Sequence, residues 1–125
     1  MAALMLLSTA EINAQDRPVV FQHGMASDGS TWNSMAQEIQ RRLHVVPVQP
    51  SIDWKAREQD QASALAAIVN SHSATAGSAS FPFVGHSNGG IVSREYRRQG
   101  GRIDGLLTLN SPHQGAAIAT NFLNG

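Results

Sequence analysis

The sequence predicts an α/β domain in which helices flank a parallel central sheet. Short apolar runs alternate with segments whose apolar residues recur at helical spacing, and this alternation is typical of βαβ units. The chain has 125 residues, 42% of them hydrophobic, which suits one domain with a single core. It has no cysteine, so disulfides, thiol nucleophiles and thiolate metal sites are excluded.

Each of the four expected strands is short and rich in Val, Leu, Ile or Phe, as strands buried on both faces are. Their ranges are 18–23, 43–48, 83–86 and 103–109. Pro18 and Pro82 suit strand entrances, where a missing N–H is tolerated. Pro47 predicts that the second strand is peripheral or ends early.

Amphipathic helices are expected between the strands. The first covers residues 32–43, with Ser30 or Thr31 as its N-cap. The second lies within residues 53–72, and a loop of small residues follows it.

The N-terminal residues 1–17 form a segment separate from the expected domain at 18–125. Residues 2–7 are apolar, but no Lys or Arg precedes them, so the segment is interpreted as a short helix or a signal-peptide remnant. Both a secreted and a cytoplasmic location stay open. No stretch approaches the roughly 20 apolar residues that cross a bilayer, so no transmembrane span is predicted.

The charge balance and the missing motifs exclude several classes of binding partner and cofactor. Nine Lys and Arg balance nine Asp and Glu, which disfavours nucleic acid and anionic membranes as partners. No His, Asp and Glu cluster has metal-ligand spacing, so no metal is expected. The glycine-rich phosphate-binding patterns are missing as well, and no cofactor is predicted.

The most specific motif is Gly-His-Ser-Asn-Gly at residues 85–89, between an expected strand and an expected helix. A serine at such a tight turn exposes its hydroxyl above the sheet. Gly85 and Gly89 let strand and helix approach closely. The helix is expected to begin just after Ser87 and to end at the glycine pair at 100–101.

Acyl-transfer chemistry also needs an oxyanion hole, with one N–H from the residue after the nucleophile and another from a second loop. The sequence His23-Gly24-Met25 closes the first expected strand. The carboxyl ends of parallel strands meet at one edge of a sheet, so this loop is the candidate for the second donor.

Three segments, at 21–32, 84–90 and 107–115, look like the lipase and esterase branch of the α/β-hydrolase superfamily. Ser-Pro-His-Gln-Gly at 111–115 is similar to the Thr-Pro-His-x-Gly stretch of triacylglycerol lipases and of the GPI inositol-deacylase-like group. The resemblance implies that the four strands are the third to sixth of the family's sheet. Their implied spatial order is second, first, third, fourth.

The resemblance also implies a mechanism and a substrate class. Ser87 matches the nucleophile, which forms an acyl-enzyme, and the backbone N–H groups of Met25 and Asn88 match the oxyanion hole. The motif glycines are Gly24, Gly85 and Gly89. The implied function is hydrolysis of a small-molecule carboxylic ester or a lipid ester. Thioesterase, amidase or acyltransferase chemistry would use the same residues.

The chain departs from the family pattern because the remaining triad members, an acid and a histidine, come later in such chains. The chain to Gly125 is therefore expected to be a fragment of a larger hydrolase that is inactive alone. It should expose an apolar sheet edge and either aggregate or remain partly unfolded. The alternative is a non-catalytic α/β module or a truncated gene product.

The other titratable residues are expected to be structural. His23 and His113 should orient loops, and His86 should point away from the nucleophile. Asp28 should shape the loop after Gly24, and Asp53 should cap the helix that follows it. Asp104 should lie on the surface at the opposite end of the sheet.

Overall fold

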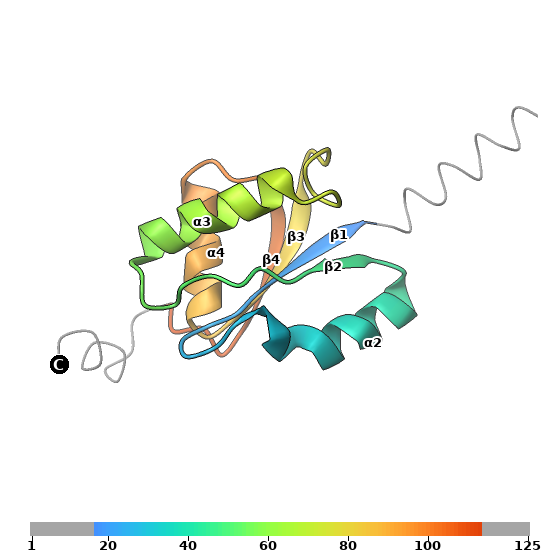
Figure 1. Cartoon of the computed structure of the whole chain (residues 1–125), viewed down its shortest axis with the longest axis horizontal. Helices are drawn as coiled ribbons and strands as arrows, with labels where there is room; N and C mark the ends of the chain where they lie inside the picture. The colour runs from blue at the N-terminus through green and yellow to red at the C-terminus, as the bar shows by residue number, and fades with distance from the viewer. Residues whose placement is uncertain (1–16, 114–125) are drawn as a thin grey trace, which may run out of the picture.

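A computed structural model describes residues 17–113 of the chain (Figure 1). The expected N-terminal segment lies outside the described residues, apart from Arg17. The last two residues of the Ser-Pro-His-Gln-Gly stretch also lie outside them.

A single parallel sheet organises the described residues. Its strands are β1 (Pro18–Gln22), β2 (Val46–Val48), β3 (Phe81–His86) and β4 (Ile103–Leu109). Their order is β2-β1-β3-β4, and every neighbouring pair is parallel. The predicted fold class and strand order are therefore confirmed, and the strands' carboxyl ends share one edge.

The helices cover both faces of this sheet. The short η1 (Gly29–Trp32) and α2 (Asn33–Leu43) lie on one face, whereas α3 (Glu58–Ser71) and α4 (Asn88–Arg98) cover the other (Figure 1). Alternate residues of β1 supply the two cores. Val20 packs under α3 and α4, and Phe21 packs under α2.

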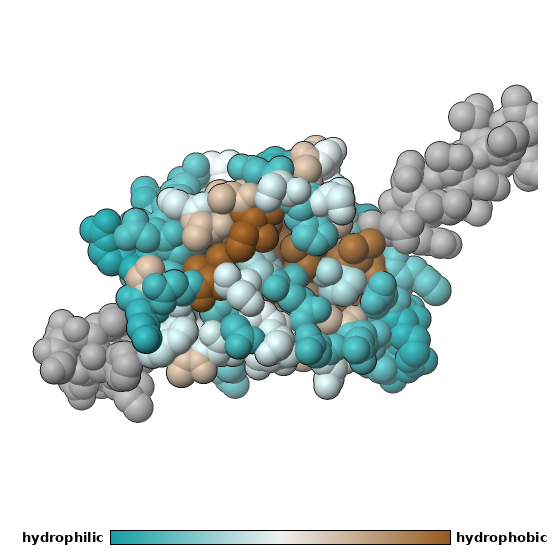
Figure 2. Space-filling view, in the orientation of Figure 1, coloured by the Kyte–Doolittle hydropathy of each residue, from teal (hydrophilic) through white to brown (hydrophobic). Residues whose placement is uncertain are grey.

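The core under α3 and α4 is the larger one. Phe83 stacks between two other rings of this core. The centroid of its ring lies 5.7 Å from that of Phe81 and 5.2 Å from that of Tyr96. Burial of each such ring stabilises the fold by about 1.5–3 kcal/mol. Hydrophilic side chains surround the hydrophobic ones on the face shown in Figure 2.

Three strand boundaries differ from the predicted ones. The first strand ends at Gln22, one residue before its predicted end. The second strand begins at Val46 rather than at residue 43, because α2 continues to Leu43 and His44 ends it in a left-handed conformation with φ 53°. Its three residues lie at the sheet edge, as Pro47 predicts. The third strand begins at Phe81, and the pairing register shifts between Phe81 and Pro82, which accommodates the missing N–H.

Two predicted caps are wrong. Asp28, rather than Ser30 or Thr31, begins the first helical segment, because its carboxylate accepts the Ser30 N–H at 2.8 Å. Asp53 caps no helix. Its carboxylate accepts the Lys55 N–H at 3.0 Å in a turn, and α3 starts five residues later at Glu58.

Candidate active site

Ser87 occupies the turn between β3 and α4. Its backbone has φ 55° and ψ −127°, an unusual conformation for a residue with a side chain. The Ser87 N–H donates to the Leu109 carbonyl at 2.9 Å, so the end of β4 holds the turn in place. The side chain is half-buried at the carboxyl edge of the sheet.

The two glycines of the motif permit close contact between α4 and the strands. A Cβ on Gly85 would lie 2.7 Å from the Gly90 Cα, and one on Gly89 would overlap the Gln22 carbonyl oxygen. Any side chain at either position would push α4 away from the sheet. These contacts explain the Gly-x-Ser-x-Gly spacing physically.

The loop after β1 lies directly against this turn. A Cβ on Gly24 would lie 2.8 Å from the Ser87 Cβ and 3.3 Å from the Asn88 nitrogen. The Met25 N–H donates to no other described residue. Asn88 is the first residue of α4, where a backbone N–H has no intrahelical acceptor. The loop therefore brings an unpartnered N–H close to the serine and to the start of α4.

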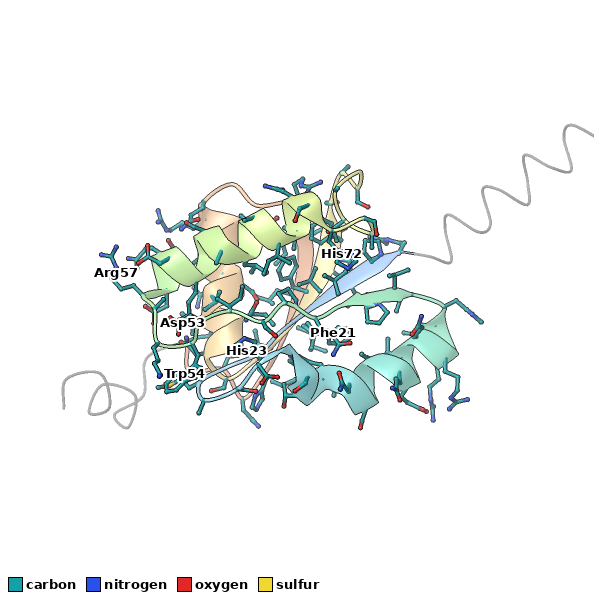
Figure 3. All side chains as sticks on the ribbon, viewed as in Figure 1. Phe21, His23, Asp53, Trp54, Arg57 and His72 are labelled. Carbon is teal, nitrogen blue, oxygen red and sulfur yellow. The ribbon has the colours of Figure 1, made fainter. Side chains whose placement is uncertain are left out.

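A pocket of about 250 Å³ opens beside these groups. Met25 and Asn88 line one side of it, and Trp54, Lys55 and Arg57 are among the residues of the other side. Figure 3 shows that Asp53, Trp54 and Arg57 follow one another along the segment that leads into α3. The Lys55 ammonium lies 5.6 Å from the centre of the Trp54 ring.

His23 is buried and uses both of its ring nitrogens. Nδ1 lies 2.9 Å from the Gly24 carbonyl oxygen, and Nε2 accepts the Ile52 N–H at 2.8 Å. This is the loop-orienting arrangement expected from the sequence. Both ring nitrogens are thus engaged, and His23 forms no hydrogen bond with the Ser87 hydroxyl.

The other two histidines near this edge have different neighbours. The exposed His86 ring stands edge-on to Trp32, with centroids 6.4 Å apart. The His113 Nδ1 lies 3.0 Å from a guanidinium nitrogen of Arg94, and its Nε2 lies 3.2 Å from the Thr108 hydroxyl. Within residues 17–113 no side chain hydrogen-bonds the Ser87 hydroxyl.

None of the acidic residues within 17–113 forms a hydrogen bond or an ion pair with Ser87. Hydrogen bonds from the Ser30 hydroxyl and N–H hold the pKa of Asp28 below its ordinary value. Asp104 pairs with Arg17 at 2.9 Å and accepts from Ser80, at the end of the sheet opposite Ser87. No group of metal-ligating side chains occurs among the described residues, and no described helix could span a membrane.

Comparison with known proteins identifies the family. The model of the palmitoyl protein thioesterase family matches residues 18–124. The chain belongs to the palmitoyl protein thioesterase family. No curated protein matches the chain significantly. The predicted membership of the α/β-hydrolase superfamily is confirmed.

Solved structures agree with this fold. The mature Bacillus licheniformis lipase BlEst2 is 25% identical with a TM-score of 0.70, over 85% of this chain and 45% of the lipase. Est816, an N-acyl homoserine lactone degrading enzyme, is 20% identical with a TM-score of 0.61, over 86% and 47% of the two chains. An extracellular α/β-hydrolase from a Paenibacillus species is 18% identical with a TM-score of 0.63, and the match covers 76% of this chain and 40% of that hydrolase. The chain thus spans less than half the length of each of these proteins.

Sequence reasoning missed one part of this candidate site, the pocket wall between β2 and α3. Gln61 holds that wall, because its buried amide donates to the carbonyls of Trp54 and Ala56 at 3.3 and 2.7 Å. A signal was present, since Gln61 is a polar residue four positions before the buried Leu65, on the inward face of α3.

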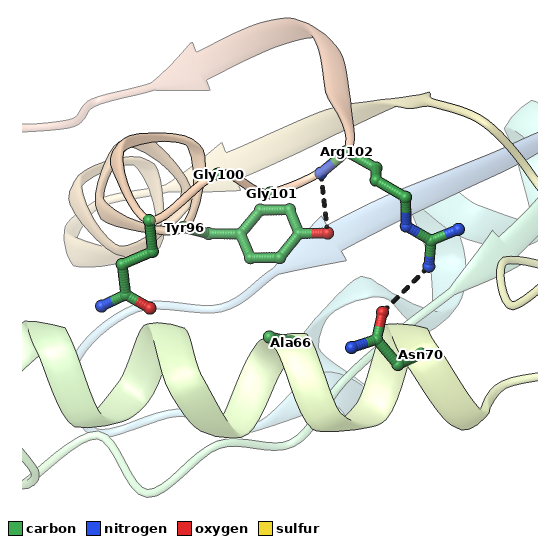
Figure 4. Close-up of a pocket in the computed structure, with 7 residues that line it drawn as sticks. Ala66, Asn70, Tyr96, Gly100, Gly101 and Arg102 are labelled. Carbon is green, nitrogen blue, oxygen red and sulfur yellow. Dashed lines mark hydrogen bonds between the residues drawn. The ribbon is translucent and has the colours of Figure 1, made fainter.

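A second pocket, of about 310 Å³, lies between α3, α4 and the start of β4 (Figure 4). There the Arg102 guanidinium donates to the Asn70 side chain, and the Arg102 N–H donates to the Tyr96 hydroxyl at 3.1 Å. Arg102 also donates to carbonyls of the loop that precedes β3. These contacts join α3, α4 and β4 and lie at the amino ends of the strands, away from Ser87.

Proposed function

We propose that the protein hydrolyses acyl thioesters or carboxylic esters through an acyl-enzyme formed on Ser87. The observation that carries the proposal is the contact between the Ser87 turn and the Gly24-Met25 loop. A serine on a strained strand-to-helix turn, beside unpartnered backbone N–H groups, suits nucleophilic attack on an acyl group. Membership of the thioesterase family supports a thioester, and similarity to a lipase supports an ester.

In the proposed reaction, the Ser87 oxygen attacks the acyl carbonyl carbon while a base accepts the hydroxyl proton. The N–H groups of Met25 and Asn88 stabilise the negative oxygen of the tetrahedral intermediate. The thiol or alcohol leaves with a proton, and the acyl group remains on Ser87. Water then attacks the acyl-enzyme, which releases the carboxylic acid and restores the serine.

The base and its acidic partner are assigned to residues outside 17–113 in the full-length protein. His23 and His113 already have hydrogen-bond partners at both ring nitrogens. In α/β-hydrolases the acid and the histidine follow the nucleophile along the chain, which agrees with this assignment.

The proposed substrate carries a long fatty acyl group. The family name specifies palmitoyl protein, a lipid-modified polypeptide. The pocket beside Met25 and Asn88 lies next to the position assigned to the acyl carbonyl. A lipid thioester is therefore the first substrate class to test, and a soluble carboxylic ester is the second.

The test compares the full-length protein with its Ser87→Ala and Ser63→Ala variants. Ser63 is the matched control, because it is an exposed serine whose hydroxyl bonds only to the Gln59 carbonyl of its own helix. Ser87→Ala is expected to abolish labelling by a fluorophosphonate and to lower kcat for a palmitoyl thioester on the order of 10⁶-fold. Ser63→Ala should match the wild type. Full turnover by Ser87→Ala would refute the proposed nucleophile.

The second candidate is a non-catalytic α/β module. It is favoured by one observation, that no described side chain hydrogen-bonds the Ser87 hydroxyl. A folded full-length protein that neither reacts with the fluorophosphonate nor hydrolyses any ester or thioester would support this candidate.

A further inference from the structure

The buried His23 ring lies between the proposed oxyanion loop and the pocket wall. It is 1% exposed, and it joins two segments that are 29 residues apart in sequence. The Ile52 backbone nitrogen can only donate, so His23 Nε2 must be an unprotonated acceptor. The proton of the neutral ring therefore lies on Nδ1 and is donated to the Gly24 carbonyl oxygen at 2.9 Å.

This hydrogen bond determines the direction of the next N–H group. The Gly24 C=O and the Met25 N–H belong to the same peptide unit, which is planar. The described residues contain no cis peptide bond, so the two groups point in opposite directions. A donor that holds the Gly24 oxygen on one side thereby fixes the orientation of the Met25 N–H on the other.

The ring itself is held in place. Ile52 is buried, and it precedes the segment 53–57 that contributes to the wall of the pocket. Gln61 fixes that segment through the carbonyls of Trp54 and Ala56. The Ile52 N–H therefore offers the ring a rigid anchor, and this anchor directly precedes the wall segment that faces Met25 and Asn88.

We propose that His23 is a positioning residue that aims the Met25 N–H at the oxygen of the reacting acyl group. The inference rests on the proposed function and deepens it, because it assigns the geometry of the oxyanion hole to one side chain. His23 does not touch the substrate. It acts through the Gly24-Met25 peptide, in its Nδ1-protonated form.

Two substitutions separate the two hydrogen bonds of the ring. The amide nitrogen of an Asn side chain can take the place of Nδ1, so His23→Asn keeps the donor to Gly24 and loses the acceptor for Ile52. The amide oxygen of a Gln side chain can take the place of Nε2, so His23→Gln keeps the acceptor and loses the donor. Each variant loses one buried hydrogen bond, and the two should lose similar thermal stability.

The catalytic parameters of the two variants should differ. In the full-length protein with a soluble ester, His23→Gln is expected to lower kcat by about 10²–10³-fold, the usual effect of losing one oxyanion donor, with little change in KM. His23→Asn should keep kcat within a few fold of the wild type. Equal losses of kcat in both variants, or no loss in either, would overturn the inference.

Two further measurements test the role of His23 independently of whether both variants fold. Nitrogen-15 NMR of the wild-type histidines should show His23 protonated on Nδ1, and protonation on Nε2 would contradict the assignment even if neither variant folds. Ser87→Ala separates the two proposals. If it retains turnover, the proposed function fails, whereas loss of turnover in Ser87→Ala with unchanged kcat in His23→Gln overturns only the role of His23.

Discussion

Gly24 is the residue at which the loop after β1 meets the Ser87 turn. Its Cα faces the His86 carbonyl oxygen and the Ser87 Cβ so closely that a Cβ would approach them to 2.7 and 2.8 Å. Real Cβ atoms do not come that near to backbone atoms, so the loop would have to shift. The lack of a side chain at Gly24 therefore sets the distance between the proposed nucleophile and the Met25 N–H.

Gly24→Ala should consequently reduce activity more than stability. The added methyl group displaces the loop from Ser87, and a shift near 1 Å in such a site costs about 10²-fold in rate. Gly77→Ala is the matched control, since nothing lies within 4 Å of a Cβ there. Steady-state kcat and thermal melting of both variants check the prediction. An active Gly24→Ala protein would mean that this contact does not set the geometry of the site.

At the scale of elements, the predicted and observed structures differ mainly in where the helices begin and end. Hydrophobic spacing predicts where α2, α3 and α4 lie, but their ends depend on caps. His44 ends α2 in a left-handed conformation that usually favours glycine, and Asp28 begins η1 from two residues before the expected cap. Neither cap follows from the apolar pattern.

Asp28→Ala should lower the melting temperature by a few degrees near neutral pH, because the Ser30 N–H loses its acceptor. The folded-state pKa of Asp28 is lowered by Ser30, so its charge stabilises the fold above the unfolded-state pKa and this contribution disappears as the pH falls through the folded-state pKa. The melting temperatures of the wild type and of Asp28→Ala, plotted against pH, should therefore converge at acidic pH. Asp28→Asn keeps an acceptor without the charge, so near neutral pH its melting temperature should lie between those of the wild type and of Asp28→Ala. A gap between wild type and Asp28→Ala that widens in acid would contradict this account.

At the scale of the whole molecule, the sheet has two different edges. β2 is three residues long and contains Pro47, features that discourage further pairing. β4 is seven residues long, pairs only with β3 among the described residues, and has Leu107 60% exposed. Beyond the register shift near Asp104, the rest of this edge is apolar and favours edge-to-edge association.

Leu107→Lys should therefore reduce the self-association of the 125-residue chain. A charge on an exposed edge opposes pairing with a second copy. Leu43→Lys is the control, because Leu43 is equally exposed, at 64%, but lies at the end of α2. Light scattering against concentration should fall for Leu107→Lys and stay unchanged for Leu43→Lys. An equal effect of both would indicate general solubility rather than the β4 edge.

The sequence by itself determined the fold class, the positions of the strands and the turn that presents Ser87. Apolar runs and helical spacing act over a few residues, and the motif at 85–89 couples them to a specific turn. The resemblance carried by three motifs then supplied the order of the strands.

Only the tertiary structure decided what surrounds that turn. The His23 ring meets Ile52, and Gly24 meets Ser87, across sequence separations that no local pattern encodes. Asp53 is predicted to cap a helix, but it lies instead in a turn of the segment whose carbonyls Gln61 holds. The physical reason is that these hydrogen bonds and close contacts form only when the parallel order β2-β1-β3 brings the carboxyl ends of the strands together.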